Sequence, residues 1–188
     1  MDRLLTVSRA IDGMNAAIGR VAAWLTLVMV LIGAGNAIAR YSDRFTHLGL
    51  TSNAWIETQW YLFSLVFLFG APWALKTGSH VRVDVLYGRL GTRARAWIDL
   101  IGGVVFLLPF CVFALVVSWP PIADSIAVRE VSPDPGGLPR WPIKACVLVA
   151  FSLLLLQGWS EVIKRIAYLR GGDAVALGLQ AEREEASD

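Results

Sequence analysis

The sequence contains few charged residues for a chain of its length. Asp, Glu, Lys and Arg make up 17% of the 188 residues, whereas 56% of them are hydrophobic. A soluble domain of this size normally carries more charge on its surface. This shortage excludes an ordinary soluble domain and indicates a protein whose outer surface faces lipid.

The sequence also has few cysteines and histidines, which excludes several kinds of reactive site. Cys111 and Cys146 occur without a CxxC motif, so neither a thiol-redox motif nor a zinc site is supported. His47 and His80 fall on opposite faces of the topology derived below, so they cannot ligate one haem or build a catalytic triad. We expect no enzyme activity, cofactor or metal. Two inert buried thiols are expected, with a Cys111–Cys146 bridge as the alternative.

Long apolar runs are what the sequence has in abundance. Four of them reach the roughly 20 residues that cross a bilayer, and they lie at about 21–39, 54–75, 97–119 and 142–163. A helix satisfies its own backbone hydrogen bonds, as lipid requires. We therefore predict an all-α integral membrane protein with four transmembrane helices in one domain over 1–170, followed by a polar, flexible tail over 171–188.

Basic residues are distributed unevenly among the predicted loops. Twelve of the 17 Lys and Arg residues fall at the two ends of the chain and in the loop over 76–96, while five fall in or beside the loops over 40–53 and 120–141. An excess of Lys and Arg marks the cytoplasmic side, so both termini should be cytoplasmic. This role accounts for the net charge of +2, and no nucleic-acid partner is expected.

The centres of the four predicted spans carry no charge. The residues nearest the midplane are Val30, Leu65, Leu108 and Ser152, and no Asp, Glu, Lys or Arg lies within about two turns of them. Transporters commonly place their sites at this depth, on ionisable groups or broken helices. The chain is therefore not expected to carry an ion or a charged solute by itself.

Individual residues in the spans predict local contacts. Glu57 lies in the outermost turn of the second span, where it should either reach the headgroup layer or contact a partner helix or lipid amine. Glu161 precedes Arg165 by four residues and could pair with it on a helix. Pro109 lies inside the third span and should kink it.

The short charged stretch GSHVRVDVLYGRL, residues 78–90, separates the second and third apolar runs. Its alternation suggests a strand, but one helix face would carry Val83, Leu86, Tyr87 and Leu90. A strand without a partner would leave its edges unpaired. We predict a short amphipathic arm helix on the cytoplasmic surface. A metal site at His80 and Asp84 would have only two ligands and is not expected.

A longer stretch that includes this segment resembles a known family. ETQWYLFSLVFLFGAPWALKTGSHVRVDVLYGRL, residues 57–90, is similar to the signature of the small membrane subunit of TRAP (tripartite ATP-independent periplasmic) transporters. The matching positions are Glu57, Trp60, Gly70, Ala71, His80, Val83 and Asp84. Two departures are Pro72 after Ala71 and Ser79 before His80. RARAWIDLIG and GGLPRWPIK resemble the branch labelled mannitol, chloroaromatic or taurine type.

The resemblance implies a non-catalytic scaffold in the bacterial inner membrane. Its partners would be a large membrane subunit that carries the transport site, a periplasmic binding protein that delivers a solute such as an organic acid, and membrane lipid. A sodium gradient would drive import. The motif residues, together with Leu86 and Tyr87, are the expected partner-interface or structural positions. The alternative is a stand-alone four-helix membrane redox enzyme or anchor subunit.

Overall fold

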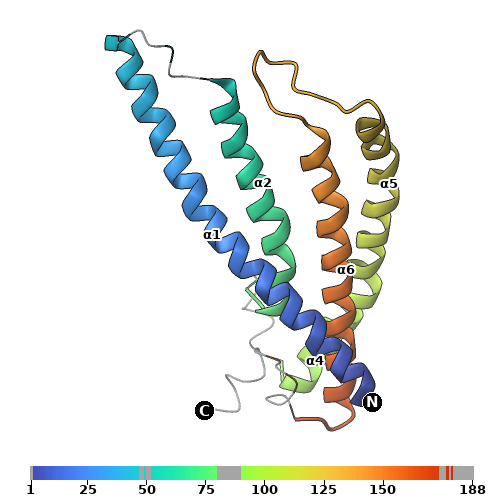
Figure 1. Ribbon diagram of the computed structural model, residues 1–188. Coiled ribbons are helices and arrows are strands. Elements are labelled where there is room, and N and C mark those ends of the chain that lie inside the picture. Colours follow the sequence, from blue (N-terminus) through green and yellow to red (C-terminus); the bar gives the residue numbers. More distant parts are fainter. Residues whose placement is uncertain are drawn as a thin grey trace.

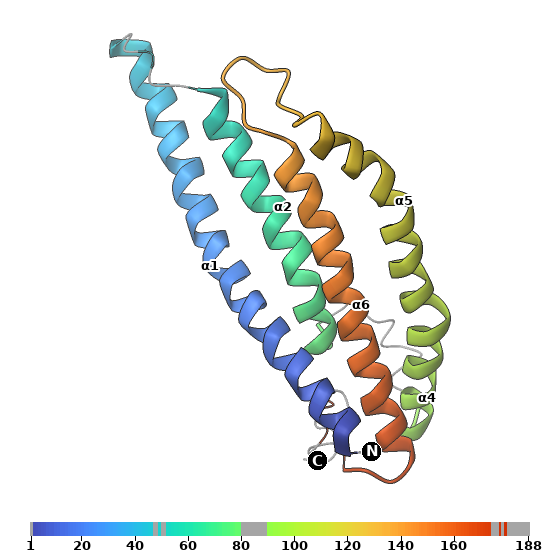
Figure 2. The same ribbon diagram turned by 45° about the vertical axis from the view of Figure 1, so that its right-hand side comes forward.

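The described residues form a bundle of long helices that lie side by side (Figure 1, Figure 2). The structure, a computed structural model, describes residues 2–46, 49, 52–79, 90–173, 177 and 179. Its elements are α1 (Asp2–Thr46), α2 (Asn53–Lys76), α4 (Thr92–Gly102), the π-helical segment η1 (Gly103–Leu107), α5 (Leu108–Ala127) and α6 (Trp141–Leu169). The predicted all-α class is confirmed for these residues. The predicted arm helix and most of the predicted tail lie outside them.

Helix α1 begins well before the apolar run predicted at 21–39. It has 45 residues, which corresponds to about 68 Å at 1.5 Å per residue. Hydropathy marks only the lipid-facing part of a helix, and it missed the first turns because their polar side chains pack on α6. In both views the N-terminal part of α1 lies across the C-terminal part of α6 (Figure 1, Figure 2).

Helix α2 closely follows the predicted span 54–75. Its first turn is capped by Ser52, whose hydroxyl accepts a hydrogen bond from the Ala54 N–H at 3.2 Å. Beyond Lys76 the chain turns at Gly78, where φ is +64°, a left-handed conformation that favours glycine.

Helices α1 and α2 approach each other closely at Gly19. A Cβ atom at this position would lie 2.7 Å from the Cβ atom of Trp73, which is too close for two non-bonded carbon atoms. At Gly13, on the same helix, an added Cβ would meet no described atom within 4 Å. The absence of a side chain at Gly19 therefore sets the local spacing of α1 and α2.

Helices α4, η1 and α5 form one continuous helix over Thr92–Ala127, which is longer at both ends than the predicted span 97–119. The sequence predicts a kink at Pro109, and the structure places η1 just before that residue. In a regular α-helix the proline ring would clash with the Val105 carbonyl, and the wider π turn relieves this clash. Figure 2 shows the helix curving alongside α6.

Helix α6 is central, because it packs against α1, α2, α4 and α5. It extends the predicted span 142–163 at its C-terminal end. Gly158 lies on the side that faces α5, where a Cβ atom would come within 2.9 Å of Leu108 Cδ2. A small residue at this point lets the two helices lie close together, as in other membrane bundles.

Several polar side chains lie inside the bundle, and many large apolar side chains lie on its surface. Trp24, Phe67 and Phe106 are 69%, 70% and 72% exposed. Buried polar or charged residues are Ser8, Asn15, Glu57, Ser125, Gln157, Ser160, Lys164 and Arg165. An apolar surface of this extent would promote association in water but suits contact with lipid.

Three helices of the described chain are long and apolar enough to cross a membrane: Arg3–Thr46, Thr92–Ala127 and Trp141–Leu169. Helix α2 has 24 residues, or about 36 Å, but Gln59, Trp60 and Tyr61 lower its mean hydropathy. Length and composition thus support three of the four predicted crossings.

Candidate functional site

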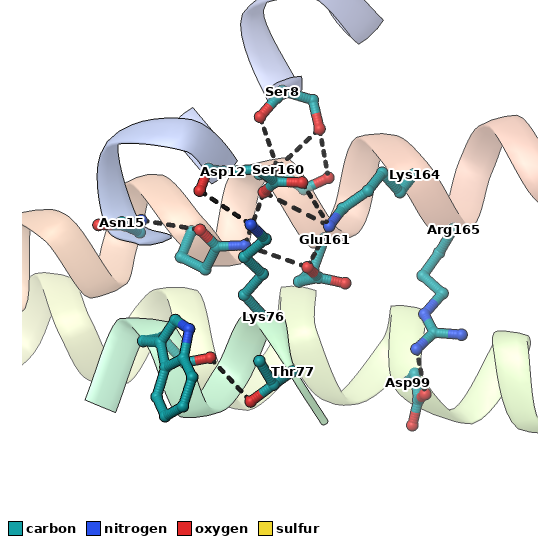
Figure 3. Close-up of polar contacts among 12 residues, drawn as sticks. Ser8, Asp12, Asn15, Lys76, Thr77, Asp99, Ser160, Glu161, Lys164 and Arg165 are labelled. Atoms are coloured by element: carbon teal, nitrogen blue, oxygen red, sulfur yellow. Dashed lines mark hydrogen bonds and ion pairs between the residues drawn. The ribbon is translucent and has the colours of Figure 1, made fainter. Parts of the chain in front are cut away.

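A network of polar side chains joins α1 to α6 at the end of the bundle where α1 begins (Figure 3). Its α1 members follow i, i+4, i+7 spacing and its α6 members follow i, i+3, i+4, i+7 spacing, so each set occupies one helix face. The α1–α6 network consists of Ser8, Asp12 and Asn15 from α1, and Gln157, Ser160, Glu161 and Lys164 from α6.

Lys164 supplies the positive charge of the α1–α6 network. The residue is 3% exposed, and its Nζ lies 3.1 Å from Oδ2 of Asp12. The same ammonium forms an ion pair with Glu161, one turn earlier on α6. A buried ammonium is stable only with such partners, because burial removes the water that would solvate it.

Gln157 connects the carboxylates of Asp12 and Glu161 and is fully buried. Its amide nitrogen donates to Oδ1 of Asp12 at 2.9 Å and to Oε1 of Glu161 at 3.1 Å. Its amide oxygen accepts from the Asn15 side chain at 2.7 Å. Ser160 also donates to Asp12, at 2.8 Å. The carboxylate of Asp12 therefore has partners at both oxygens.

Two further contacts extend this polar region to α2 and α4. The Lys76 ammonium of α2 donates to the backbone carbonyl of Asp12 at 3.1 Å. Arg165 of α6, which is 6% exposed, lies 2.9 Å from Asp99 of α4. The sequence led us to expect Arg165 beside Glu161, but the closest contacts place Lys164 there instead. Four helices are thus tied together at one end of the bundle (Figure 3).

At the opposite end, Glu57 of α2 holds the loop over 128–140. The residue is 4% exposed, and its carboxylate accepts hydrogen bonds from the Ser132 hydroxyl and the Leu138 N–H. We expected Glu57 to reach headgroups or a partner, and the structure instead turns it onto the chain's own loop. A Cβ atom at Gly137 would come within 2.9 Å of the carboxylate, so glycine leaves room for this contact.

Two more side chains of α2 hold the same loop. Asn53 donates to the Pro135 carbonyl at 3.0 Å, and the Tyr61 hydroxyl donates to the Pro139 carbonyl at 2.8 Å. These bonds satisfy carbonyls of a segment that has no regular secondary structure. The loop over 128–140 is therefore fastened to α2 along three residues of one helix face.

Glu130, in the same loop, connects α5 to α6. Its carboxylate accepts from the Ser125 hydroxyl at 2.6 Å and forms an ion pair with Lys144. The Lys144 hydrogen bond, followed by that of Ser125, lowers the pKa of the Glu130 carboxyl below its usual value of 4.5. The backbone carbonyl of Glu130 also accepts from the Arg140 N–H at 2.8 Å.

Four of the nine predicted motif residues lie in α2. Besides Glu57, Trp60 is 39% exposed and lies edge-on to Tyr61 with ring centroids 4.2 Å apart. Gly70 and Ala71 are half-buried in the second half of the helix. The other five motif residues lie outside the described residues: His80, Val83, Asp84, Leu86 and Tyr87.

The contacts found in the structure fasten helices and loops of the chain to one another. Cys111 is buried and Cys146 is half-buried, and both thiols are free, so the alternative of a bridge between them is wrong. In the part of the chain that is described, no three His, Cys, Asp or Glu residues lie close enough to hold a metal. The charged groups of the α1–α6 network are already bonded to one another, which suits fixing helices in place.

Sequence reasoning missed the N-terminal half of the α1–α6 network. Ser8, Asp12 and Asn15 precede the apolar run predicted at 21–39, and hydropathy gives no sign of them. Their spacing of four and three residues was the available signal, since it places them on one face of a helix.

Comparison with known protein families gives one match. Residues 29–167 match the family described as tripartite ATP-independent periplasmic transporters, DctQ component. No curated protein and no solved structure matches the chain. The matched region holds Glu57 and the α6 part of the α1–α6 network, whereas Asp12 precedes it. Because the match covers well over half of the 188 residues, the chain belongs to the family of DctQ components, the small membrane components of TRAP transporters.

Proposed function

We propose that this chain is the fixed scaffold that holds the large TRAP membrane subunit during sodium-gradient-driven import. The solute would be an organic acid or a similar small molecule delivered by a periplasmic binding protein. One observation carries the scaffold role. Buried cations of α6 are used in contacts with other helices of the described bundle: Lys164 pairs with Asp12 of α1, and Arg165 pairs with Asp99 of α4.

A bundle fastened at both ends suits a subunit against which another moves. At one end, ion pairs and hydrogen bonds join α1, α2, α4 and α6. At the other end, Glu57 and Glu130 hold the loop over 128–140. Helices joined in this way resist sliding, because each shift would leave a buried polar group without its partner.

Family membership decides between the two functions suggested by the sequence. DctQ components are non-catalytic membrane subunits, so the prediction that the chain is not an enzyme is confirmed. The match favours a transporter component over a stand-alone membrane redox enzyme. The partners follow by proposal from the family: the large membrane subunit, the periplasmic binding protein and surrounding lipid.

The orientation and the fourth crossing also belong to this proposal. We place the chain in the bacterial inner membrane with both termini in the cytoplasm, supported by the excess of Lys and Arg at that end. Helix α2 would be the fourth crossing, because it lies beside α1 and α6 over its length (Figure 1, Figure 2). Residues 1–170 would form one membrane domain.

Family membership also leads us to propose an interface role for the motif residues and a branch of the family for the chain. Trp60 is partly exposed on α2, which leaves it available to a partner. Leu86 and Tyr87, in the proposed arm helix, would lie on lipid or the large subunit. The RARAWIDLIG stretch supports the mannitol, chloroaromatic or taurine type of branch.

Reconstituted vesicles test the proposal. Purified chain alone should take up none of a set of radiolabelled organic acids, sugar alcohols and sulfonates. With the large subunit, the binding protein and an inward sodium gradient, one of them should accumulate, and collapsing the gradient should stop accumulation. Uptake by the isolated chain would contradict the scaffold role. Equal uptake by the large subunit and binding protein without this chain would contradict it as well.

A further inference from the structure

A groove with a volume of about 500 Å³ lies between α2 and α6, in the half of the bundle nearer the loop over 128–140. Its apolar lining consists of Trp60, Phe63, Phe67 and Leu68 from α2 and Ile143 and Val147 from α6. From Trp60 to Leu68 the wall extends about 12 Å along the helix axis. The apolar walls of the groove are therefore suited to a hydrocarbon chain.

Ser64, the uncharged polar residue in the wall, leaves the groove suited to an apolar occupant. Ser64 lines the groove, but its hydroxyl donates to the Trp60 carbonyl of its own helix at 2.9 Å. Its hydrogen-bonding requirement is thereby met within α2. An occupant of this part of the groove therefore does not need to accept a hydrogen bond from Ser64.

Charge is concentrated at one end of the groove, where α6 begins. Arg140 and Lys144 both line that end. The Lys144 ammonium is bonded to Glu130. The buried Nε of Arg140, by contrast, has no hydrogen-bond partner among the described residues. A buried N–H of a cation without an acceptor is costly, and Arg140 lines the groove, so an acceptor in the groove that draws this side chain toward it would relieve the cost.

An occupant with an anionic head and an apolar tail satisfies both parts of the groove. We propose that the groove binds one membrane phospholipid, with an acyl chain between α2 and α6 and its phosphate at the Arg140 guanidinium. Phosphate oxygens are strong acceptors that match the guanidinium donors. Arg140 also attracts the carboxylates of Glu57 and Glu130 electrostatically, but those carboxylates accept their hydrogen bonds from other groups.

Native mass spectrometry of the full chain in mild detergent tests this assignment. Dipalmitoyl phosphatidylglycerol is titrated beside dipalmitoylglycerol, which has the same chains and no phosphate. Wild type should bind the phospholipid more tightly by roughly 10- to 100-fold, the usual effect of a hydrogen bond to a charged group. Arg140→Gln should remove this difference and leave binding of the diacylglycerol unchanged.

A second variant blocks the groove without changing any charge. Val147→Phe should weaken binding of both lipids by at least about tenfold, because a larger side chain fills the space for the tail. Val116→Phe is the matched control, since Val116 is 66% exposed on α5, away from the groove, and it should bind as wild type does. A folding defect in Arg140→Gln therefore cannot imitate the expected pattern.

Two results would overturn the proposal. One is equal affinity of wild type, Arg140→Gln and Val147→Phe for the phospholipid. The other is loss of bound phospholipid when the large subunit is co-purified, together with weakened assembly of Val147→Phe. The second result would assign the groove to a helix of the partner protein.

Discussion

Lys164 is the residue whose surroundings most constrain this end of the bundle. Its side chain is 4% exposed and lies between the carboxylates of Asp12 and Glu161. Each of the three groups would be unstable in the bundle without the others, because an unpaired buried charge loses its solvation. Lys144 offers a natural comparison on the same helix, since its ion pair with Glu130 is 41% exposed on the lysine side.

Replacing Lys164 with Met should therefore be far more destabilising than the same change at Lys144. Loss of the buried ammonium leaves Asp12 and Glu161 facing each other, and breaking a buried pair costs about 3–5 kcal/mol. Unfolding of the full chain in detergent, followed by tryptophan fluorescence, measures both variants. Lys144→Met should cost much less, because water solvates the carboxylate that remains. Equal losses would show that the α1–α6 network contributes little.

Glu130 should make the loop over 128–140 sensitive to acid. Its pKa is lowered in the folded chain, so the unfolded chain binds a proton more readily. The stabilising contribution is complete above the usual value of 4.5 and is lost as the pH falls through the lower, folded pKa. Unfolding measured from pH 6 down to pH 3 should show a smaller pH dependence for Glu130→Gln than for wild type. Identical curves would argue against the Ser125 and Lys144 contacts.

At the scale of helices, α1 shows how packing overrides hydropathy. The apolar run predicted a helix over 21–39, and that part is correct, but Ser8, Asp12 and Asn15 extend it because α6 satisfies them. Nothing in the first 20 residues alone identifies those partners, which lie more than 140 positions away in the chain. The bounds of a helix over 54–75 were predicted well, since Ser52 and Gly78 mark the ends of α2 locally.

Two glycines of α1 allow the closeness of α1 and α2 to be tested. Gly13→Ala should leave stability unchanged or raise it by up to about 1 kcal/mol, because alanine favours helix and its Cβ meets open space. Gly19→Ala has the same helix preference, but its Cβ would collide with Trp73. Overpacking should lower the free energy of unfolding by about 1–3 kcal/mol. The comparison uses the unfolding assay described for Lys164, and similar behaviour of both variants would contradict the close approach.

For the molecule as a whole, the loops and helix ends that the Lys and Arg distribution assigned to one side of the membrane lie at the same end of the bundle. The loop over 128–140 and the C-terminal end of α1 lie at one end of the bundle, while the C-terminal ends of α2 and α6 lie toward the other (Figure 1). The sequence predicted this division from Lys and Arg alone. It could not predict Glu57 on the loop or Arg165 on Asp99, because these contacts depend on how the helices are rotated.

Reporter fusions test the orientation of the whole chain. Fusions after Lys76 and Arg170 should report the cytoplasm, and fusions near Thr46 and Asp134 should report the periplasm. The reason is the excess of Lys and Arg at the first two positions. An alkaline phosphatase and a green fluorescent protein series at the same sites gives opposite readouts. A reversed pattern would place the α1–α6 network at the periplasmic end.

The π-helical segment Gly103–Leu107 is a place where the long helix of α4, η1 and α5 can gain or lose one residue. Three turns of regular α-helix take about 11 residues, yet the buried positions Ala96 and Leu108 on either side are 12 apart. The wide turn accommodates one extra residue and keeps both halves in phase against α6. Deleting one residue within the segment would keep the same face of both halves inward, although Pro109 would then clash with the carbonyl four residues before it. The same deletion within α5 would rotate everything beyond it by about 100°. Single-residue insertions and deletions among relatives should therefore concentrate at this turn.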